Sequence, residues 1–595
     1  MINFNVQIRD FPFSADCQSL IEQWKNGNHE YGANWPVVYL LHNDDTREAY
    51  IGETLNAGKR AAQHWQVDER KRLKTIHILT DDTFNKSVIL DLESFLIKYI
   101  SADGKYSLQN GNTGLSDFDY YGRNDYEKQF QKIWDCLREL GLVQSGIADI
   151  ENSDLYKYSP YKTLTDDQGI VLGKILGILT LCLKEDMSET VVVEGGAGTG
   201  KTILAVFLLK LLNDLKSNTF EQNEELSESK IVSLQALLAN RDLRIGFVVP
   251  QQSLRETLKK VFRTIRGIPE SMIMTPAEAA RAALESPFDL LVCDEAHRLR
   301  RREALSQYPA YDRINSDLSL PADTTELEWI IRSSRMQILF YDSAQSVRPS
   351  DIPREMFRQI LNEQGNRQTL KLSSQLRCLG GDDYIQYIHE VLNYEGFGVV
   401  TTQHGSESVV MRESSPFWPH PHAKFQDYSI QYFEDVDMMM DKINELDQQY
   451  DLCCAVAGYA WKWITRDEPK NTALRDIDIG RGYIWNRTYT DWINSDRLPY
   501  EIGCIHTVQG YDLNYVGVIL GPEIYYDKST GRIEVNKSKY MDSLGKAVGN
   551  NYEALRNYIL NIYKTLLTRG IRGVLVYVCD PDLREHLRPF FEVAK

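Results

Sequence analysis

A glycine-rich segment, Gly195-Gly-Ala-Gly-Thr-Gly-Lys-Thr202, fits the pattern GxxxxGK[ST] and lies between the apolar run VVVE and the helical run ILAVFLLKLL. Glycines let a backbone wrap phosphate groups without Cβ clashes, and the N-terminus of the following helix directs N–H groups and a positive dipole at them. We expect Lys201 to reach the β- and γ-phosphates and Thr202 to coordinate Mg²⁺ through its hydroxyl. The predicted phosphate loop consists of Gly195, Gly196, Ala197, Gly198, Thr199, Gly200, Lys201 and Thr202.

Two carboxylates end a second apolar run, which reads FDLLVCDEAH over residues 288–297. Asp294 is expected to hold the hydrated Mg²⁺, and Glu295 to orient or deprotonate the attacking water. An acidic turn after a strand is common by itself, but downstream of a phosphate loop it indicates nucleotide hydrolysis. The sequence has no NKxD segment for guanine selectivity. ATP and Mg²⁺ are therefore the expected cofactors.

Further segments follow the order of the motifs of superfamily 1 helicases and resemble them. They are LTDDQ (164–168), FVVPQQ (247–252), YDSAQ (341–345), LSSQLR (372–377), HTVQG (506–510) and TLLTR (565–569). The resemblance covers about residues 160–595 and implies adenine contact by Gln168 and nucleic-acid contact by FVVPQQ. LSSQLRC, GYAW and IHTVQGYDLNYVGVILG are similar to the bacterial helicase-like branch related to the ATPase lobes of Schlafen proteins. The chain departs from the motifs at Tyr341, where glycine is usual, and at Asp512, where many relatives have glutamate.

The same resemblance implies further roles in ATP hydrolysis. Gln345 would belong to the catalytic residues. Arg377 and Arg569 would be arginine fingers that reach the γ-phosphate across a cleft between two lobes. Gln509 and Gly510 would bind the nucleotide from the second lobe.

A second resemblance concerns the first 110 residues. Val37-Val-Tyr39, ten residues, and then Tyr50-Ile-Gly52 is similar to a GIY-YIG endonuclease, with valine in place of the first glycine. Because that glycine lies in a strand, its loss should affect packing rather than chemistry. Asn110 would hold the active-site loop. The remaining positions of the family are matched by Arg60, His64 and Glu93.

This resemblance implies metal-dependent cleavage of a phosphodiester. Glu93 would be the one protein carboxylate on Mg²⁺ or Mn²⁺, and Arg60 would bind phosphate oxygens as a rigid fork. Tyr39 could take the proton from water if adjacent cations lower the pKa of its phenol from about 10. His64 and Tyr50 could orient water or donate to phosphate. The sequence leaves open which of Tyr39, Tyr50 and His64 is the general base.

The pattern of apolar residues indicates elements of two kinds. Before residue 155 we expect a hairpin, three helical stretches and a Gly/Asn/Asp/Tyr-rich loop at 110–125. The hairpin runs are 37–41 and 49–52, and the helical stretches are 57–73, 88–100 and 126–140. Farther along, wholly apolar runs alternate with helical stretches, which is typical of parallel strands buried on both faces. These runs are 191–193, 245–249, 290–293, 338–340, 455–457, 516–520 and 574–578.

We therefore predict an α/β chain of three domains. A small α/β domain of the GIY-YIG nuclease type with a helical linker occupies residues 1–155. Two RecA-like lobes with parallel sheets follow, the first at 156–380 and the second at 381–595.

The composition excludes several classes of protein. Hydrophobic residues make up 43% and charged residues 25%, which is ordinary globular usage and excludes a disordered or fibrous chain. The net charge of -17 excludes a histone-like coat of positive charge, but not a local basic groove. No apolar stretch reaches the ~18 residues that suggest a membrane span. The nine cysteines form no CxxC pair, and we expect a cytoplasmic protein with Cys453 and Cys454 in a strand core.

Several features could form a nucleic-acid surface. Basic clusters lie at 59–74, 255–266 and 298–302, although such runs are usually solvated helix faces. Tryptophans in the second lobe could stack bases or pack in a core. They are Trp461, Trp463, Trp485 and Trp492. The segment WPHPH at 418–422 we interpret as a loop rather than a metal site.

Three functions remain open from sequence. The first is a helicase-like ATPase fused to a nuclease that cuts DNA, in defence against phage or in repair. The second is an RNA-cleaving enzyme like the Schlafen relatives, and the third is a sensor whose N-terminal domain only binds. DNA is the expected partner, RNA is the alternative, and a homo-oligomer stays open.

Overall fold

The computed structural model describes most of the 595-residue chain. The described residues are 5–25, 29–111, 120–217, 228–239, 241–305, 307–342, 345, 348–363, 365, 367–373, 378–393, 398–401, 407–410, 423–466, 468, 471, 473–488, 492–495, 497–508, 513–542, 545–548 and 551–594.

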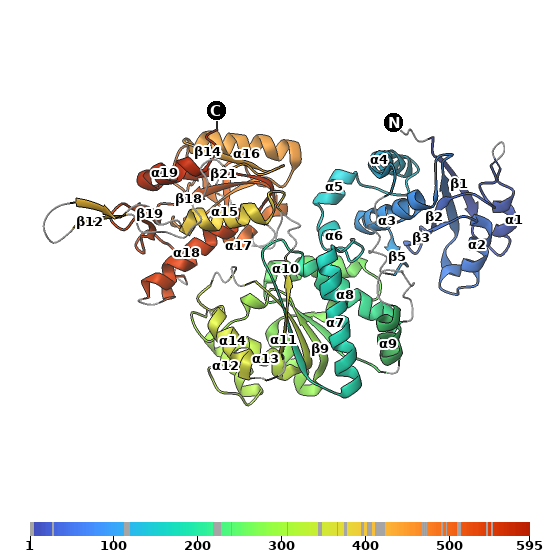
Figure 1. The fold of residues 1–595 in the computed structure, drawn as a ribbon, viewed down its shortest axis with the longest axis horizontal. Helices are drawn as coiled ribbons and strands as arrows, with labels where there is room; N and C mark the ends of the chain where they lie inside the picture. The colour runs from blue at the N-terminus through green and yellow to red at the C-terminus, as the bar shows by residue number, and fades with distance from the viewer. Residues whose placement is uncertain are drawn as a thin grey trace. The chain divides into compact units, whose positions relative to one another are not determined.

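Figure 1 shows the helices and strands of the chain, coloured from blue at the N-terminus to red at the C-terminus. The chain forms two compact units. One comprises Met1–Ser188, Thr202–Gly246 and Arg255–Ile273, and the other comprises Glu189–Lys201, Phe247–Leu254 and Met274–Lys595. The domain boundaries expected near residues 155 and 380 stay predictions.

The N-terminal part is built on a five-stranded sheet with the order β1-β4-β2-β3-β5. Its strands are β1 (Gln7–Pro12), β2 (Val37–Asn43), β3 (Glu48–Thr54), β4 (Thr75–Thr80) and β5 (Ser107–Leu108). β2 and β3 pair in antiparallel fashion, with Tyr39 opposite Gly52, so the predicted hairpin is confirmed. The helical elements are α1 (Cys17–Glu22), α2 (Ala57–Trp65), η1 (Arg70–Arg72), α3 (Lys86–Asp103), α4 (Arg123–Glu139), α5 (Ile147–Asn152) and α6 (Asp154–Lys157).

The two faces of this sheet carry different side chains, because successive residues of a strand point to opposite faces. Val38 and Leu40 of β2 belong to the hydrophobic cluster that includes residues of α3 and α4. Tyr39 of β2 and Tyr50 of β3 belong to the other cluster, with Ala61 of α2. The alternation therefore places both tyrosines on the face that carries α2.

The first parallel sheet has the strand order β11-β6-β10-β9-β7-β8. Its strands are β6 (Glu189–Gly195), β7 (Ile245–Val248), β8 (Ile273–Met274), β9 (Phe288–Cys293), β10 (Ser334–Tyr341) and β11 (Arg367–Leu372). β11, β6, β10 and β9 pair in parallel. The associated helices are α7 (Asp166–Glu185), α8 (Lys201–Lys216), α9 (Glu228–Ala239), α10 (Gln252–Thr264), α11 (Pro276–Glu285), α12 (Tyr308–Asp317), α13 (Glu326–Ser333) and α14 (Arg354–Glu363). Apolar residues of α11, α13 and α14 pack with those of β6, β9 and β10 in one cluster.

The second parallel sheet has the order β14-β21-β18-β15-β17-β16. Its strands are β14 (Ser429–Phe433), β15 (Cys454–Ala457), β16 (Ile484–Trp485), β17 (Glu501–Cys504), β18 (Leu513–Leu520) and β21 (Gly570–Val578). The accompanying helices are α15 (Gly381–Asn393), α16 (Val436–Tyr450), α17 (Ile505–Val508), α18 (Tyr552–Leu567) and α19 (Pro581–Leu587). Two hairpins are also present, β12 (Gly398–Thr401) with β13 (Glu407–Val410), and β19 (Ile524–Asp527) with β20 (Arg532–Val535). All seven predicted apolar runs are strands, and two parallel sheets confirm the α/β class with RecA-like lobes.

Buried aromatic and sulfur-containing side chains fill the second lobe. Trp461, Trp485 and Trp492 are at most 7% exposed and belong to its hydrophobic clusters, so they are packing residues rather than a base-stacking surface. Cys453 and Cys454 are buried, as expected, and all nine cysteines are described and none of them forms a disulfide. The segment 418–422 lies outside the described residues.

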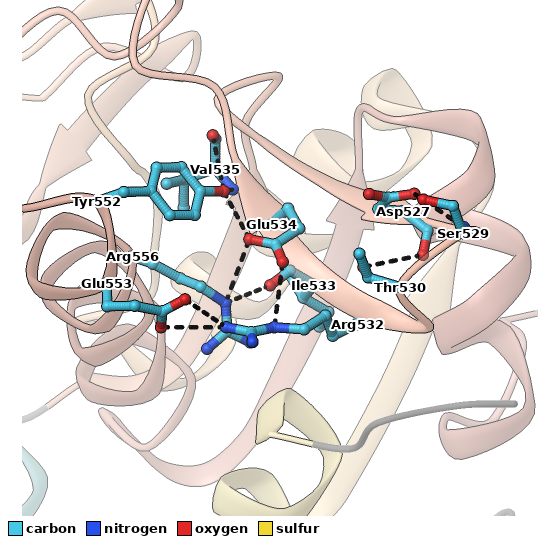
Figure 2. Close-up of polar contacts among 10 residues, drawn as sticks. All are labelled: Asp527, Ser529, Thr530, Arg532, Ile533, Glu534, Val535, Tyr552, Glu553 and Arg556. Atoms are coloured by element: carbon cyan, nitrogen blue, oxygen red, sulfur yellow. Dashed lines mark hydrogen bonds and ion pairs between the residues drawn. The ribbon is translucent and has the colours of Figure 1, made fainter. Parts of the chain in front are cut away.

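A charged cluster joins the β19–β20 hairpin to α18 (Figure 2). The Glu534 carboxylate is 3.1 Å from Arg532 Nε, 3.6 Å from Arg556 Nε, and accepts a hydrogen bond from the Tyr552 hydroxyl. Arg532 Nη2 donates to Glu553 of α18 at 3.1 Å. Glu534 is only 7% exposed, so its charge depends on these partners.

Glu534→Ala should lower the free energy of unfolding by about 2 kcal/mol, because it leaves two arginines and a hydroxyl without their shared acceptor. Urea unfolding followed by tryptophan fluorescence measures the change. Lys528→Ala is the control, because its partners Asp582 and Glu585 are exposed and its loss should cost under ~1 kcal/mol. Equal effects of the two substitutions would contradict a stabilising role for the cluster.

Candidate active sites

The phosphate loop lies between β6 and α8, as predicted. Gly198 and Gly200 have φ of 83° and 75°, in the left-handed region that favours glycine. At Gly195 an added Cβ would lie 2.5 Å from Thr199 Oγ1, so this position also requires glycine. Backbone conformation therefore explains the glycines at 198 and 200, and a close side chain explains the glycine at 195.

Lys201, the first residue of α8, is buried and held inside the loop. Its Nζ donates to the carbonyl oxygens of Gly195 and Gly196 at 2.8 and 2.7 Å, and lies 3.4 Å from Asp342 Oδ2. Gln345 Nε2 donates to the same Asp342 oxygen at 2.7 Å. The structure thus links the predicted residues Gln345 and Lys201 through Asp342, which our sequence prediction of site residues omitted although it lies in the YDSAQ segment.

The two predicted acidic residues follow β9. Asp294 is fully buried, and its backbone N–H donates to Val248 O at 3.0 Å. Glu295 has a φ of 52°, unusual for a side chain of this size, and its carboxylate lies 3.0 Å from His297 Nε2. Burial acts to raise the pKa of Glu295, but His297, Lys201 and Arg298 outweigh it and hold that pKa below its usual range. Glu295 is therefore an ionised carboxylate at neutral pH.

Of the remaining residues expected at the ATP site, the structure describes some and not others. Gln168 is buried and forms the capping box of α7, in which its Oε1 accepts from the Thr165 N–H at 3.1 Å. Arg569 is 2% exposed and lies between α18 and β21. Their nucleotide contacts stay predictions. Arg377, Gln509, Gly510 and Asp512 lie outside the described residues.

The N-terminal site brings together residues of β2, α2 and η1. The Tyr39 hydroxyl lies 2.6 Å from His64 Nε2, and Arg60 Nε donates to the same hydroxyl at 3.4 Å. Arg70 Nη1 contacts His64 Nδ1, and its guanidinium lies 3.8 Å from the centroid of the Tyr50 ring. Four of the predicted residues, Tyr39, Tyr50, Arg60 and His64, thus lie close together.

The contacts of His64 determine which of its nitrogens carries the proton. A guanidinium has only donors, so His64 Nδ1 must accept from Arg70. A neutral imidazole then carries its hydrogen on Nε2 and donates it to the Tyr39 oxygen. Because Arg60 donates to the same oxygen, the hydroxyl hydrogen of Tyr39 must point toward a different acceptor.

Burial dominates the titration of this site. It raises the pKa of Tyr39 above its usual value, and the opposing charges of Arg60 and Arg70 do not compensate. Adjacent cations therefore do not lower the pKa of the Tyr39 phenol below its usual value, which the role of Tyr39 as general base would require. Burial, together with the charges of Arg70 and Arg60, lowers the pKa of His64 to about 2. The site therefore holds a neutral imidazole and a neutral phenol at physiological pH.

Asn110 and Gly52 fix the strand that carries Tyr50. Asn110 Oδ1 accepts from the Ile51 N–H at 3.0 Å and Nδ2 donates to the Ile51 carbonyl at 2.8 Å, so Asn110 fastens β3 next to the site. A Cβ at Gly52 would lie 2.2 Å from the Tyr39 hydroxyl oxygen, which excludes any larger residue. Glu93 lies on α3, and its charge acts on the Tyr39 phenol.

Arg70 was not among the predicted site residues. It lies in the short turn η1 within the basic run at 59–74, whose composition resembles a solvated surface. The spacing from His64 carries no family pattern that would have identified it. Only the fold shows that this arginine contacts both His64 and Tyr50.

The basic cluster at 298–302 is a network of ion pairs rather than a free surface. Arg298 pairs with Asp351 at 3.1 Å and Arg300 pairs with Glu326 at 2.6 Å. Arg302 pairs with Asp312 at 2.6 Å. Nearby carboxylates therefore offset much of the positive charge of this cluster, and its role as a nucleic-acid surface stays a prediction.

Two features are absent from the residues that the structure describes. These residues contain no group of three or more histidine, cysteine, aspartate or glutamate side chains placed to hold a metal ion. Within the described part of the chain, no helix combines the length and apolar character that crossing a membrane requires.

Comparison with known proteins gives one family and one relative. The family model "Schlafen group 3, DNA/RNA helicase domain" matches residues 188–580. An uncharacterized protein of Saccharomyces cerevisiae, YPL245W, is 24% identical over 453 residues, which cover 71% of this chain and 90% of the yeast protein.

Solved structures align only weakly with this chain. The Escherichia coli DEAH/RHA helicase HrpB aligns with 72% of this chain and 44% of its own, at 9% identity and a TM-score of 0.24. A DNA replication initiation factor aligns with 40% of this chain and 54% of its own, at 12% identity and a TM-score of 0.19. The chain thus spans about half the length of these two structures. At such TM-scores they say nothing about its activity.

His64→Gln should make the protein less sensitive to acid. Histidine in the unfolded chain binds a proton below pH ~6.5, whereas folded His64 does not, so falling pH favours unfolding by up to about 1.4 kcal/mol per pH unit through this group. Urea unfolding at pH 7.5 and 5.5 measures the loss of stability, which should be smaller in His64→Gln by about 1 kcal/mol. His29→Gln, at a side chain 39% exposed, is the control. An unchanged pH dependence in His64→Gln would show that folded His64 takes up a proton.

Proposed function

Because this chain belongs to the Schlafen group 3 family of DNA/RNA helicase domains, we propose that it is a nucleic-acid-dependent ATPase. We further propose that this ATPase is fused to a metal-dependent endonuclease that cuts DNA. The observation that carries the ATPase is the network of Gln345, Asp342 and Lys201 in the phosphate loop. The observation that carries the nuclease is the cluster of two arginines around the neutral Tyr39–His64 pair.

ATP hydrolysis would use residues at the ends of β6, β9 and β10. Lys201 would exchange its carbonyl partners for the β- and γ-phosphates, and the ionised Glu295 would orient the attacking water. Thr202 and Asp294 supply the oxygen ligands that Mg²⁺ prefers, and the ion would neutralise charge developing on the phosphates. Gln168, Gln509 and Gly510 would contact the nucleotide.

The arginine fingers complete this proposal. Arg377 and Arg569 would stabilise the charge on the γ-phosphate in the transition state. FVVPQQ would contact the nucleic acid that stimulates turnover.

DNA cleavage would use the N-terminal site. Glu93 would hold Mg²⁺ or Mn²⁺, which would polarise the phosphate and its bound water. Arg60 would bind phosphate oxygens, and Arg70 would keep the His64 proton on Nε2. With two donors on its oxygen, Tyr39 is arranged to donate its hydroxyl hydrogen toward the substrate or a leaving oxygen. His64 and Tyr39 then act as a pair, and Tyr50 packs beside them.

The cellular role would be restriction of invading DNA such as phage DNA, or DNA repair. An enzyme that cuts RNA is the alternative, since the family model names both nucleic acids. The third candidate function is a sensor that binds nucleic acid without cutting it. A sensor would hydrolyse ATP without cleaving any nucleic acid.

Lys201→Ala and Glu295→Gln should each lower kcat for ATP by about 10² or more, because they remove the phosphate cation and the carboxylate that positions water. Steady-state phosphate release with Mg²⁺ and added DNA or RNA measures this. Glu295→Gln should still bind ATP. Glu585→Gln, at an exposed surface carboxylate, should behave like wild type. Normal turnover in Lys201→Ala would refute the ATPase assignment.

Glu93→Ala should abolish cleavage while ATP hydrolysis continues, because Glu93 is the one carboxylate assigned to the nuclease metal. Single- and double-stranded DNA and RNA are incubated with Mg²⁺ or Mn²⁺ and resolved on denaturing gels, with and without ATP. Glu139→Ala, at an exposed carboxylate on α4, is the matched control. Cleavage of RNA alone would favour the alternative, and cleavage by Glu93→Ala equal to that of wild type would support the sensor.

A further inference from the structure

A pocket of about 430 Å³ lies on the first parallel sheet beside α14. Its volume falls within the roughly 300–1,000 Å³ range of small-molecule sites. The residues that give it its chemistry are Arg354 and Arg358 of α14, Arg367 and Lys371 of β11, Glu194 of β6 and Tyr341 of β10. None of these residues belongs to the phosphate loop or to the N-terminal site.

The register of the sheet brings the strand residues of this pocket together. Glu194 is the partner of Lys371 on one side and of Tyr341 on the other. Arg367 and Lys371 are four positions apart on β11, so they share one face. β11 is the edge strand, which leaves the pocket accessible from that side.

The pocket carries an excess of positive charge. Four cationic side chains line it against one carboxylate, Glu194, and all four are exposed. Within the described residues, none of the four forms an ion pair, in contrast to the paired arginines at 298–302. Unpaired arginines around a concave site are suited to bind the oxygens of an anion as bidentate donors.

Tyr341 supplies a second, independent indication of a ligand. Its ring is 2% exposed and stacks on Phe357, with ring centroids 4.3 Å apart. Among the described residues, no hydrogen-bond partner reaches its hydroxyl. Burial raises the pKa of Tyr341 to about 12, so the hydroxyl remains a donor at neutral pH. A buried donor without an acceptor is costly, and a ligand oxygen would satisfy it.

We propose that this pocket binds the phosphate group of a nucleotide-sized ligand, through the four cations and the Tyr341 hydroxyl. A phosphate monoester matches the site better than a carboxylate, because it offers two negative charges and three terminal oxygens to several donors. Two sources share this chemistry, a free nucleoside monophosphate and the phosphorylated end of a nucleic-acid strand. Tyr341 stands where glycine is usual in the helicase motif, and in this proposal its hydroxyl binds the phosphate group.

Binding to the full chain is measured by isothermal titration calorimetry with four probes. These are inorganic phosphate, AMP, a 5′-phosphorylated trinucleotide and the same trinucleotide with a 5′-hydroxyl. Tyr341→Phe keeps the ring and should weaken phosphate-bearing probes about tenfold, the loss expected for one hydrogen bond to a charged group. The double variant Arg354→Gln/Arg358→Gln should weaken them by more than tenfold.

Two controls separate this pocket from the ATP site and from general charge effects. Lys201→Ala should leave the binding of the 5′-phosphorylated trinucleotide unchanged, and so should Arg332→Gln at an exposed arginine of α13. The tighter of AMP and the phosphorylated trinucleotide identifies the source of the phosphate. The proposal is overturned if no phosphate-bearing probe binds, if the 5′-hydroxyl trinucleotide binds equally well, or if Lys201→Ala rather than the double variant removes binding. The result does not depend on whether the chain hydrolyses ATP.

Discussion

The register of three parallel strands is the constraint on which the ATP site depends. Phe340 of β10 pairs with Val193 of β6, and Leu339 pairs with Cys293 of β9. All three strands therefore end at the same end of the sheet, with Gly195 as the last residue of β6 and with Asp294 and Asp342 directly after β9 and β10. Because the strands are buried on both faces, a shift of register would expose apolar side chains as well as separate these groups.

The N-terminal site depends on burial in a different way. A phenol and an imidazole withdrawn from water both favour their neutral forms. Two guanidinium groups then act through hydrogen bonds rather than through titration, because Arg70 and Arg60 donate to His64 and Tyr39. In a site of this kind the hydrogen bonds fix where each hydrogen points, and this determines which atoms can donate a hydrogen to a ligand.

Much of the fold could be predicted from the sequence because strong local patterns carry it. Wholly apolar runs such as 516–520 strongly predict buried strands. The glycines at 198 and 200 of the phosphate loop are explained by the positive φ of these two residues. Long-range pairing could not be predicted in this way. Arg298 and Arg300 resemble a free basic patch until the fold brings Asp351 and Glu326 to them.

The candidate sites show the same limit. His64 and Arg60 were identified by family spacing, but Arg70 was missed because a three-residue turn in a basic run has no distinctive pattern. The pKa of Tyr39 could not be inferred from the sequence, because sequence shows nearby charges without showing burial. Desolvation is a property of the packed molecule, and here it exceeds the effect of two arginines.

The state of the cysteines has a practical consequence for following motion in this chain. Seven of the nine thiols are buried, and only Cys136 and Cys579 are partly accessible. Burial raises the pKa of the Cys579 thiol to about 12, so little thiolate forms there to react with a maleimide. A dye-labelling strategy therefore needs to replace Cys136 alone. Two cysteines introduced on exposed helices, one in each parallel-sheet lobe, could then carry a donor and an acceptor fluorophore.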